Sequence, residues 1–186
     1  MNKKQIIVIA VLTFLFVFGV CMYIARVKYI NDIYPQNTRI HVKKSDVYTD
    51  ENGMEYTITT VDYMTGEEYI KKYGENQDVI GSYPQKVIIA TVRLNNMSKK
   101  ANTYDLSKFY IETPTYCNGI CLDSFMQINS CEMSGTIDGG ESMDAKLFYT
   151  VEDDYISTAT WENLKIDDFV LAYGYYTRKV IFELGV

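Results

Sequence analysis

The chain has 186 residues, of which 47% are hydrophobic, which suits one globular domain with an appendage and excludes a chain that is disordered throughout. All 24 acidic residues and 16 of the 18 Lys and Arg residues lie after Ala25, so that part carries a net charge of −8. Such an acidic balance argues against nucleic-acid binding, whose affinity comes mainly from neutralising phosphates. The 17 tyrosines favour β structure, because aromatic side chains suit pleated, half-buried surfaces.

The N-terminal segment predicts a membrane anchor. Residues 6–25 carry no charge and are apolar on every side of a helix. A helix of that length spans roughly 30 Å at about 1.5 Å per residue, which is the thickness of the hydrocarbon core of a bilayer. We expect residues 1–5 to form a short cytoplasmic tail, residues 6–25 a transmembrane signal anchor, residues 26–37 a stalk closed by Pro35, and residues 38–186 an extracellular domain.

Neither processing signal is well formed in this segment. Cleavage by signal peptidase after Ala25 would place the large Tyr23 at position −3, where a small residue is preferred. Lipid attachment at Cys21 would need a small residue just before the cysteine, and Val20 stands there. We therefore expect an uncleaved anchor in a single-pass protein of the cell membrane, with the lipid-modified form as the alternative.

From residue 38 onward the apolar residues recur with a period of two, which is typical of strands. A turn at Asp50–Gly53 separates a first strand, which contains Ile40 and Val42, from a second strand at Met54–Tyr63, and together they predict a hairpin. Lys86–Asn95 is apolar on both faces in its first half, which predicts a central strand. The other long predicted strands are Lys108–Tyr116, Ile120–Ile128, Met143–Val151, Leu164–Tyr173 and Lys179–Leu184.

Two segments interrupt this pattern and predict short helices. Thr65–Gly74 breaks the β alternation, and Glu152–Asn163 contains the only tryptophan, Trp161. A Gly139–Gly140 turn precedes the strand at Met143–Val151. About eight short strands separated by turns predict an all-β fold, an antiparallel immunoglobulin-like β-sandwich of about seven to nine strands, preceded by one N-terminal transmembrane helix.

Three stretches resemble small exported immunoglobulin-like domains of Gram-positive bacteria. KVIIATVRLNN (86–96) resembles their central strand, which ends in Asn, and FYIETPTYCNGICLD (109–123) resembles the hairpin that follows. TIDGGESMDAKLFYTV (136–151) resembles their Gly-Gly-Glu turn and the next strand. These domains form the telokin-like group of unknown function and are usually tethered by a lipid or a single helix. The resemblance covers about Thr38 to the C-terminus and implies this fold and an outside location, but it brings no catalytic residues. The motif of the lipid-tethered members is absent.

Three of the four cysteines lie beyond the predicted anchor: Cys117, Cys121 and Cys131. Asn118–Gly119 predicts the two-residue tip of a hairpin, which would point Cys117 and Cys121 to opposite faces, so that they can neither join each other nor easily share a metal. Cys131 then remains as a disulfide partner for Cys117 or Cys121, and free cysteines are the alternative. The C-x3-C spacing lacks the further ligands of a zinc site, so no cofactor or metal is expected. A domain that senses a ligand or metal through this region is the alternative function.

No residue pattern predicts catalysis, and we expect this protein not to be an enzyme. The single histidine, His41, alternates with Ile40 and Val42 and is expected to face solvent, which leaves no base for a Ser-His-Asp or Cys-His arrangement. Neighbouring acids such as Asp167 and Asp168 point apart on strands and helices alike, so they do not form an acid/base couple by themselves.

The sequence therefore predicts a non-catalytic, membrane-tethered extracellular module with a binding or structural role. Its expected partners are the membrane, through residues 6–25, and an envelope protein or a cell-wall polymer. Exposed tyrosines on a sandwich can form a platform for a sugar or a peptide. Tyr173, Tyr175 and Tyr176, at the last hairpin, are the predicted aromatic binding surface.

Overall fold

The structure is a computed structural model. It describes residues 2–34, 38–74, 85–153, 156–174 and 177–185. The chain divides into two compact units, Met1–Thr38 and Arg39–Val186. The first unit holds a long helix and the second holds the sheets, so each is described by itself.

The first unit is helix α1 (Lys3–Ile33). Its start is stabilised by the Gln5 side chain, which accepts a hydrogen bond from the Asn2 backbone N–H at 3.0 Å. The helix runs through the predicted anchor without a break and makes residues 26–33 of the predicted stalk helical. Among the described residues, Gln5–Ile33 is the one helix long and apolar enough to cross a membrane, with a mean hydropathy of 2.8 in a stretch that is not buried within the protein.

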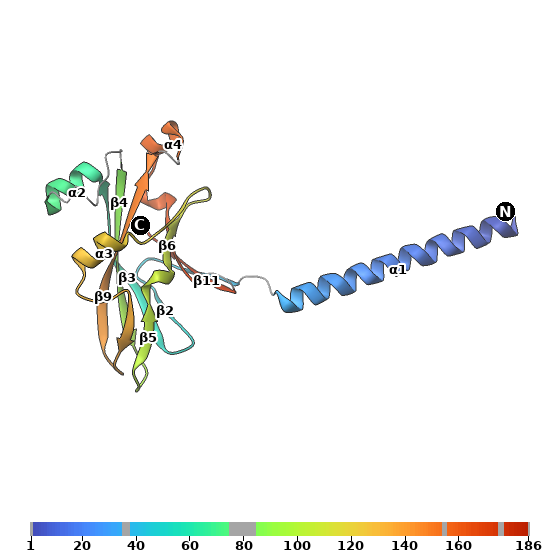
Figure 1. Cartoon of the computed structure of the whole chain (residues 1–186), viewed down its shortest axis with the longest axis horizontal. Coiled ribbons are helices and arrows are strands. Elements are labelled where there is room, and N and C mark those ends of the chain that lie inside the picture. Colours follow the sequence, from blue (N-terminus) through green and yellow to red (C-terminus); the bar gives the residue numbers. More distant parts are fainter. Residues whose placement is uncertain (1, 35–37, 75–84, 154–155, 175–176, 186) are drawn as a thin grey trace. The chain divides into compact units, whose positions relative to one another are not determined.

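In the described residues, the second unit has 11 strands in three sheets (Figure 1). The sheet orders are β1-β11-β10-β6-β7, β2-β3-β4-β9 and β5-β8. The ladders of the second and third sheets, and those from β11 to β7 in the first, are antiparallel. The strand bounds are β1 Thr38–Val42, β2 Val47–Thr49, β3 Met54–Thr65, β4 Gln85–Asn96, β5 Asn102–Asp105, β6 Phe109–Glu112, β7 Cys117–Gly119, β8 Ser134–Ile137, β9 Ser142–Glu152, β10 Val170–Tyr173 and β11 Arg178–Glu183.

The two larger sheets enclose one hydrophobic core, which makes the domain a β-sandwich. Strand β4 lies between β3 and β9, so its predicted central position is confirmed. Fully burying a side chain such as Leu94 stabilises the fold by about 1.5–3 kcal/mol. The strands predicted at Met143–Val151 and Lys179–Leu184 are also confirmed, as β9 and β11. Core residues from both sheets include Ile58, Ile88, Val92, Leu94, Ala145, Leu147, Tyr149, Val151, Phe109, Ile111, Leu171, Val180, Phe182 and Leu184.

Strand β3 changes the phase of its alternation midway. The register with β4 shifts between Ile58 and Thr60, which marks a β-bulge. One extra residue moves every later side chain to the other face. Inward residues are therefore even-numbered before the bulge, as at Tyr56, and odd-numbered after it, as at Tyr63.

Two helices cover the outer face of the four-stranded sheet (Figure 1). Helix α2 (Gly66–Tyr73) starts after Thr65, whose hydroxyl accepts from the Glu68 N–H at 3.2 Å, while the Glu68 carboxylate accepts from the Thr65 N–H at 2.8 Å. This capping box confirms the predicted helical segment. Helix α3 (Leu122–Ile128) lies against β9. The cluster beneath the two helices consists of Tyr69, Val87, Ile89 and Phe148, with Cys121 and Ile128 packed against it.

The predicted helix around Trp161 is confirmed as α4 (Thr158–Asn163). The Lys86 ammonium donates to the carbonyl oxygens of Trp161 at 2.7 Å and Leu164 at 3.1 Å, at the C-terminal end of this helix, where a cation is favoured. The same ammonium lies 4.9 Å from the centre of the Trp161 ring and 5.8 Å from that of Tyr63. The Tyr63 hydroxyl donates to the Leu164 carbonyl at 2.6 Å, so this cluster ties α4 to β3 and β4.

The predicted first strand is split in the structure. Strand β1 lies beside β11 in the five-stranded sheet, whereas β2 pairs with β3 across the predicted turn at Asp50–Gly53. Ser45, between β1 and β2, has a φ of 68°, and this left-handed conformation marks the sharp bend at which the chain changes sheets. The predicted hairpin therefore forms between β2 and β3, and β1 is not part of it. The predicted number of strands was too low because β2, β5, β7 and β8 have only three or four residues and show no long alternation.

The predicted hairpin tip at Asn118–Gly119 is wrong. These residues lie within β7, and the chain reverses earlier, where the Thr113 N–H donates to the Tyr116 carbonyl at 2.8 Å. The Thr113 hydroxyl accepts from the N–H groups of Thr115 and Tyr116 at 3.3 and 3.0 Å, so a threonine turn competes successfully with the Asn-Gly signal.

The strand predicted at Ile120–Ile128 is also wrong, because Leu122–Ile128 forms α3. Cys121, Phe125 and Ile128 follow the i, i+4, i+7 spacing of one helical face, and all three pack against hydrophobic clusters. No hairpin tip therefore separates Cys117 from Cys121, and the predicted opposition of their side chains across a hairpin does not apply.

Residues 116–129, called the edge segment below, cover the free edge of β9. This strand is the last of its sheet, so the outer backbone groups lack a strand partner. The Asn129 side chain accepts from the Lys146 N–H at 2.7 Å and donates to the Lys146 carbonyl at 2.9 Å, as a neighbouring strand would. The Cys121 N–H donates to the Phe148 carbonyl at 2.8 Å.

The edge segment continues this pattern toward the end of β9. The Asn118 side-chain amide and the Tyr116 hydroxyl both donate to the Thr150 carbonyl, at 2.9 and 3.1 Å. The carbonyl oxygens of alternate residues of β9, at Lys146, Phe148 and Thr150, thus accept hydrogen bonds without another strand. Residues 115–123 (TYCNGICLD) therefore help to cover the edge of the sheet.

Candidate functional site

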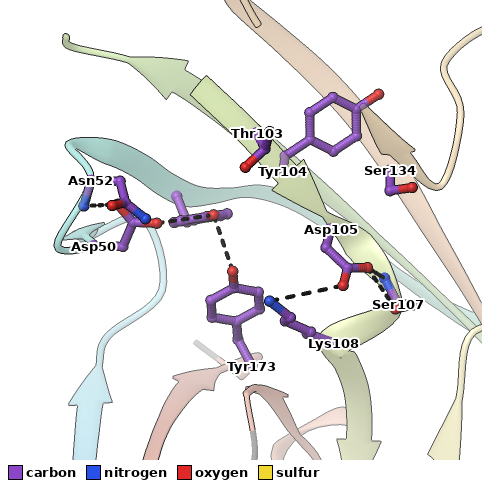
Figure 2. A pocket seen from close by; sticks show the side chains of 10 residues that line it. Asp50, Asn52, Thr103, Tyr104, Asp105, Ser107, Lys108, Ser134 and Tyr173 are labelled. Carbon is purple, nitrogen blue, oxygen red and sulfur yellow. Dashed lines mark hydrogen bonds and ion pairs between the residues drawn. The ribbon is translucent and has the colours of Figure 1, made fainter. Parts of the chain in front are cut away.

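A polar pocket of about 530 Å³ lies between the β2–β3 turn, β5, β8 and β10 (Figure 2). We call it the tyrosine pocket. Its volume is within the range of small-molecule sites, about 300–1,000 Å³. Each lining residue carries a polar side-chain group and none is aliphatic. The lining residues are Asp50, Asn52, Tyr56, Thr103, Tyr104, Asp105, Ser107, Lys108, Ser134 and Tyr173.

Two tyrosines meet at the base of this pocket. The Tyr56 and Tyr173 hydroxyls are 3.1 Å apart, and their ring centres are 4.9 Å apart. Tyr56 is 1% exposed, and the Tyr173 ring also packs 4.6 Å from that of Phe109. Burial raises the pKa of both hydroxyls, and the negative charges of Asp50 and Asp105 raise that of Tyr173 further, against the hydrogen bond with Tyr56. Both hydroxyls therefore stay protonated at neutral pH.

Two carboxylates flank the tyrosines, and each uses one oxygen to fix its own turn. Asp50 Oδ1 accepts from the N–H groups of Asn52 and Met54, both at 2.9 Å. Asp105 Oδ1 accepts from the Ser107 N–H at 3.1 Å and the Ser107 hydroxyl at 2.6 Å, at the start of the 3-10 turn η1 (Leu106–Lys108). Short polar side chains often hold turns in this way.

The second oxygen of each carboxylate makes longer contacts. Asp50 Oδ2 lies 3.4 Å from the Tyr56 hydroxyl, and Asp105 Oδ2 lies 3.8 Å from the Lys108 ammonium, which points toward it in Figure 2. A carboxylate has about four lone-pair sites, so both groups retain acceptor capacity. The pocket can therefore bind groups that donate hydrogen bonds.

One residue of the predicted aromatic binding surface lines this pocket. Tyr173 belongs to the predicted aromatic surface, while Tyr175 and Tyr176 lie outside the described residues. Tyr173 points inward to meet Tyr56, which is 117 positions away in the chain. The sequence predicts the turn at Asp50, but no local pattern indicates that this turn meets Tyr173.

The predicted cysteine region does not form a cluster. All four cysteines are free thiols in the structure. Cys131 packs against the core between the sheets, whereas Cys121 packs against the cluster on the outer face of the four-stranded sheet. Cys117 is exposed. In the part of the chain that the structure describes, no three His, Cys, Asp or Glu side chains are placed to hold a metal. The disulfide between Cys131 and either partner stays a prediction.

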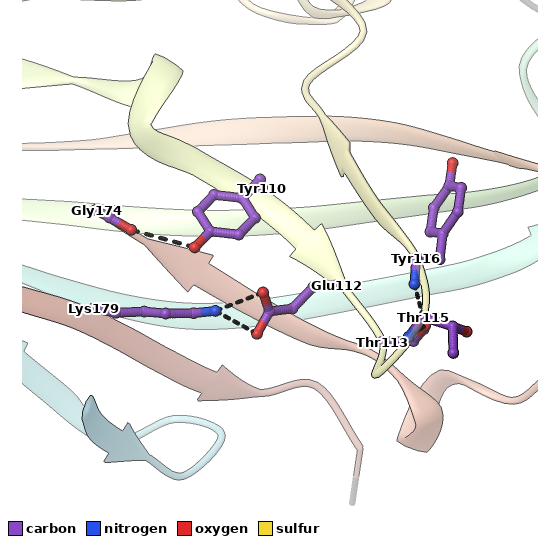
Figure 3. Close-up of polar contacts among 7 residues, drawn as sticks. All are labelled: Tyr110, Glu112, Thr113, Thr115, Tyr116, Gly174 and Lys179. Carbon is purple, nitrogen blue, oxygen red and sulfur yellow. Dashed lines mark hydrogen bonds and ion pairs between the residues drawn. The ribbon is translucent and has the colours of Figure 1, made fainter. Parts of the chain in front are cut away.

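Cys117 lies opposite Glu112 on the outer face of the five-stranded sheet. Lys179 reaches along this face, beside Tyr110, and places its ammonium 2.6 Å from both Glu112 carboxylate oxygens (Figure 3). Partial burial and the charge of Glu112 raise the pKa of the Cys117 thiol, while Lys179 lowers it. The net effect is a protonated thiol at neutral pH, which is a weak nucleophile.

His41 is exposed on β1, as the sequence predicts, and does not line the tyrosine pocket. The residues that line the pocket include no histidine or cysteine, so they do not form a nucleophile paired with an imidazole base. What they supply is a set of hydroxyl, carboxylate and ammonium groups suited to binding by hydrogen bonds.

Residues 31–176 match the family described as a domain of unknown function, DUF5028. The chain belongs to the DUF5028 family. Every residue that lines the tyrosine pocket falls within the DUF5028 match, whereas most of α1 precedes it. None of the curated proteins matches the chain.

Solved structures of low sequence identity resemble this DUF5028 protein. The yjhA protein from Bacillus subtilis is 13% identical with a TM-score of 0.45, over 77% of this chain and 98% of that one. A functionally unknown protein from Listeria monocytogenes is 17% identical with a TM-score of 0.48, over 70% and 71%. An uncharacterized beta-sandwich protein from Clostridium difficile is 12% identical with a TM-score of 0.44, over 81% and 97%. Likenesses this weak carry no argument about function.

Proposed function

We propose that this chain is a membrane-tethered, non-catalytic binding module whose sandwich domain is displayed outside the cell. The observation that carries the proposal is the combination of an apolar, unburied helix of membrane-spanning length with a separately folded domain. A soluble core helix would bury one face and expose a polar one, and α1 has no such polar face along its apolar stretch.

The proposal also specifies the orientation of the helix in the membrane and the class of β-sandwich to which the domain belongs. A short N-terminus followed by a large C-terminal domain supports a signal anchor with the domain outside. The antiparallel sandwich is compatible with an immunoglobulin-like member of the telokin-like group of Gram-positive bacteria. Its partner would be an envelope protein or a cell-wall polymer that contacts the tyrosine pocket.

The anchor is tested by fractionating cells that produce the full chain. We expect the protein in the membrane fraction, resistant to alkaline carbonate and released by detergent. A Phe14→Lys/Val17→Lys variant should move to the soluble fraction, because each charge at the centre of a span costs about 2.5–3.5 kcal/mol. A matched Phe14→Leu/Val17→Leu variant should stay in the membrane. Release of the original chain by carbonate would contradict the proposal.

The binding role is tested by sedimenting isolated cell walls with the purified full chain in lipid nanodiscs. We expect the protein to sediment with walls and empty nanodiscs to remain in solution. An Asp50→Asn/Asp105→Asn variant should sediment less, because it removes both carboxylates from the tyrosine pocket. Equal sedimentation of both chains would contradict the assignment of binding to this pocket.

A further inference from the structure

The tyrosine pocket has more hydrogen-bond acceptors than donors. Asp50 and Asp105 each have one oxygen committed to a turn and one that makes only contacts of 3.4 Å or longer. A carboxylate whose lone pairs are left unpaired after desolvation is costly, so a ligand that fills this pocket must bring donors.

The charge of the pocket selects against anionic ligands. Two carboxylates line it against one ammonium, that of Lys108. The part of the chain after Ala25 carries a net charge of −8, which adds a repulsive field around any incoming phosphate or carboxylate.

The lining also selects against apolar side chains, since none of its residues is aliphatic. Peptide ligands gain much of their affinity by burying apolar or aromatic anchors, and this pocket offers them little apolar surface beyond its tyrosine rings. Hydroxyl groups match the lining better, because each can donate to a carboxylate and accept from Lys108 or from the Tyr173 hydroxyl.

We propose that the tyrosine pocket binds an uncharged, polyhydroxylated ligand, namely the sugar units of a carbohydrate polymer. This inference rests on the proposed function and names the ligand class of the same site. Asp50 and Asp105 accept from sugar hydroxyls, Lys108 donates to them, and the Tyr56–Tyr173 pair forms the polar base of the site.

The test is calorimetric titration of the full chain in lipid nanodiscs, without glycoside detergents. The probes are a soluble β-1,4-linked tetramer of N-acetylglucosamine, inorganic pyrophosphate and tetralysine. We expect saturable binding of the tetrasaccharide alone. Asp50→Asn/Asp105→Asn should weaken it by about tenfold or more, since it replaces two charged acceptors by neutral ones. The asparagines keep the Oδ1 acceptors that hold both turns.

Two further variants separate binding from folding. Tyr173→Phe removes one hydroxyl from the pocket and keeps the ring, so it should weaken tetrasaccharide binding without unfolding the domain. Asp138→Asn changes an exposed acid that does not line the pocket and should bind the tetrasaccharide as the original chain does. Binding that is equal in all variants would overturn the proposal.

Absence of tetrasaccharide binding, or binding of pyrophosphate or tetralysine alone, would also overturn it. If the chain still sediments with cell walls in that case, the ligand class fails and the proposed function stands. Loss of both results would remove the proposed function as well.

Discussion

At the scale of single residues, Lys86 shows how one partly buried cation connects several elements. Its ammonium donates to two carbonyl oxygens at the end of α4 and lies over the rings of Trp161 and Tyr63. Burial lowers the pKa of Lys86 and the charge of Asp168 raises it, with a net lowering. The charge is stabilised there by two carbonyl acceptors and by the faces of two aromatic rings.

Replacing Lys86 by methionine keeps the apolar stem and removes the charge. We expect Lys86→Met to lower the free energy of unfolding by about 1–3 kcal/mol, because the Trp161 carbonyl loses its partner. Chemical denaturation followed by tryptophan fluorescence measures this change. The exposed Lys99→Met serves as the control and should change the value little. An unchanged stability for Lys86→Met would show that the cluster contributes nothing.

Tyrosines that are fully or partly buried predict a loss of stability in alkali. Burial, followed by the charge of Asp168, raises the pKa of Tyr63 to about 12, and burial also raises those of Tyr56 and Tyr173. Above a pH of about 10 the unfolded chain therefore releases protons that the folded chain retains, so stability falls as pH rises. In an absorbance titration of tyrosinate, these three groups should ionise after the exposed tyrosines. Titration of all tyrosines near their ordinary pKa with the fold intact would contradict this.

At the scale of elements, the edge segment shows how a single stretch can replace a strand. It bonds to Lys146, Phe148 and Thr150 of β9 through side-chain amides, one hydroxyl and one backbone N–H. An open edge would invite pairing with another chain, and this covering prevents it. Helix α3 also buries Phe125, so the same stretch serves both the edge and the core.

Among the residues of the edge segment, we expect Asn129 to contribute most to the stability of the domain. We expect Asn129→Ala to destabilise the domain by about 1–3 kcal/mol, because the Lys146 N–H and carbonyl both lose their partner. Hydrogen exchange of the Lys146 amide should become faster, while exchange in β4 should follow global stability only. Met126→Ala, at an exposed position of α3, is the control. Unchanged exchange at Lys146 would contradict the edge account.

Long alternating strands were predictable from the sequence, and β4, β9 and β11 lie where the pattern placed them. The path of the edge segment was not predictable, because it depends on hydrogen bonds to β9, and the local sequence does not indicate which residues make them. Asn118–Gly119 carries strong turn propensity, yet pairing with β6 and the bond to Thr150 keep it extended. The tyrosine pocket was predictable only through Tyr173, since Asp50 and Asp105 are local turn residues that the fold brings together.

At the scale of the whole molecule, the chain holds a helix long and apolar enough to cross a membrane and a sandwich domain with a polar pocket. A tether raises the effective concentration of a module near any partner in the same envelope, so even a partner that binds weakly can occupy the pocket. This effect requires that the domain and its partner lie on the same side of the membrane.

The side of the membrane on which the domain lies can be tested at Cys117, because this residue is exposed. Intact cells that produce the protein are treated with reductant, which frees Cys117 if it is paired, and then with a membrane-impermeant maleimide. A mildly alkaline pH compensates for the raised pKa of the thiol. Cys117→Ser controls for labelling at other cysteines. The account predicts equal labelling of Cys117 before and after lysis, and labelling only after lysis would contradict it.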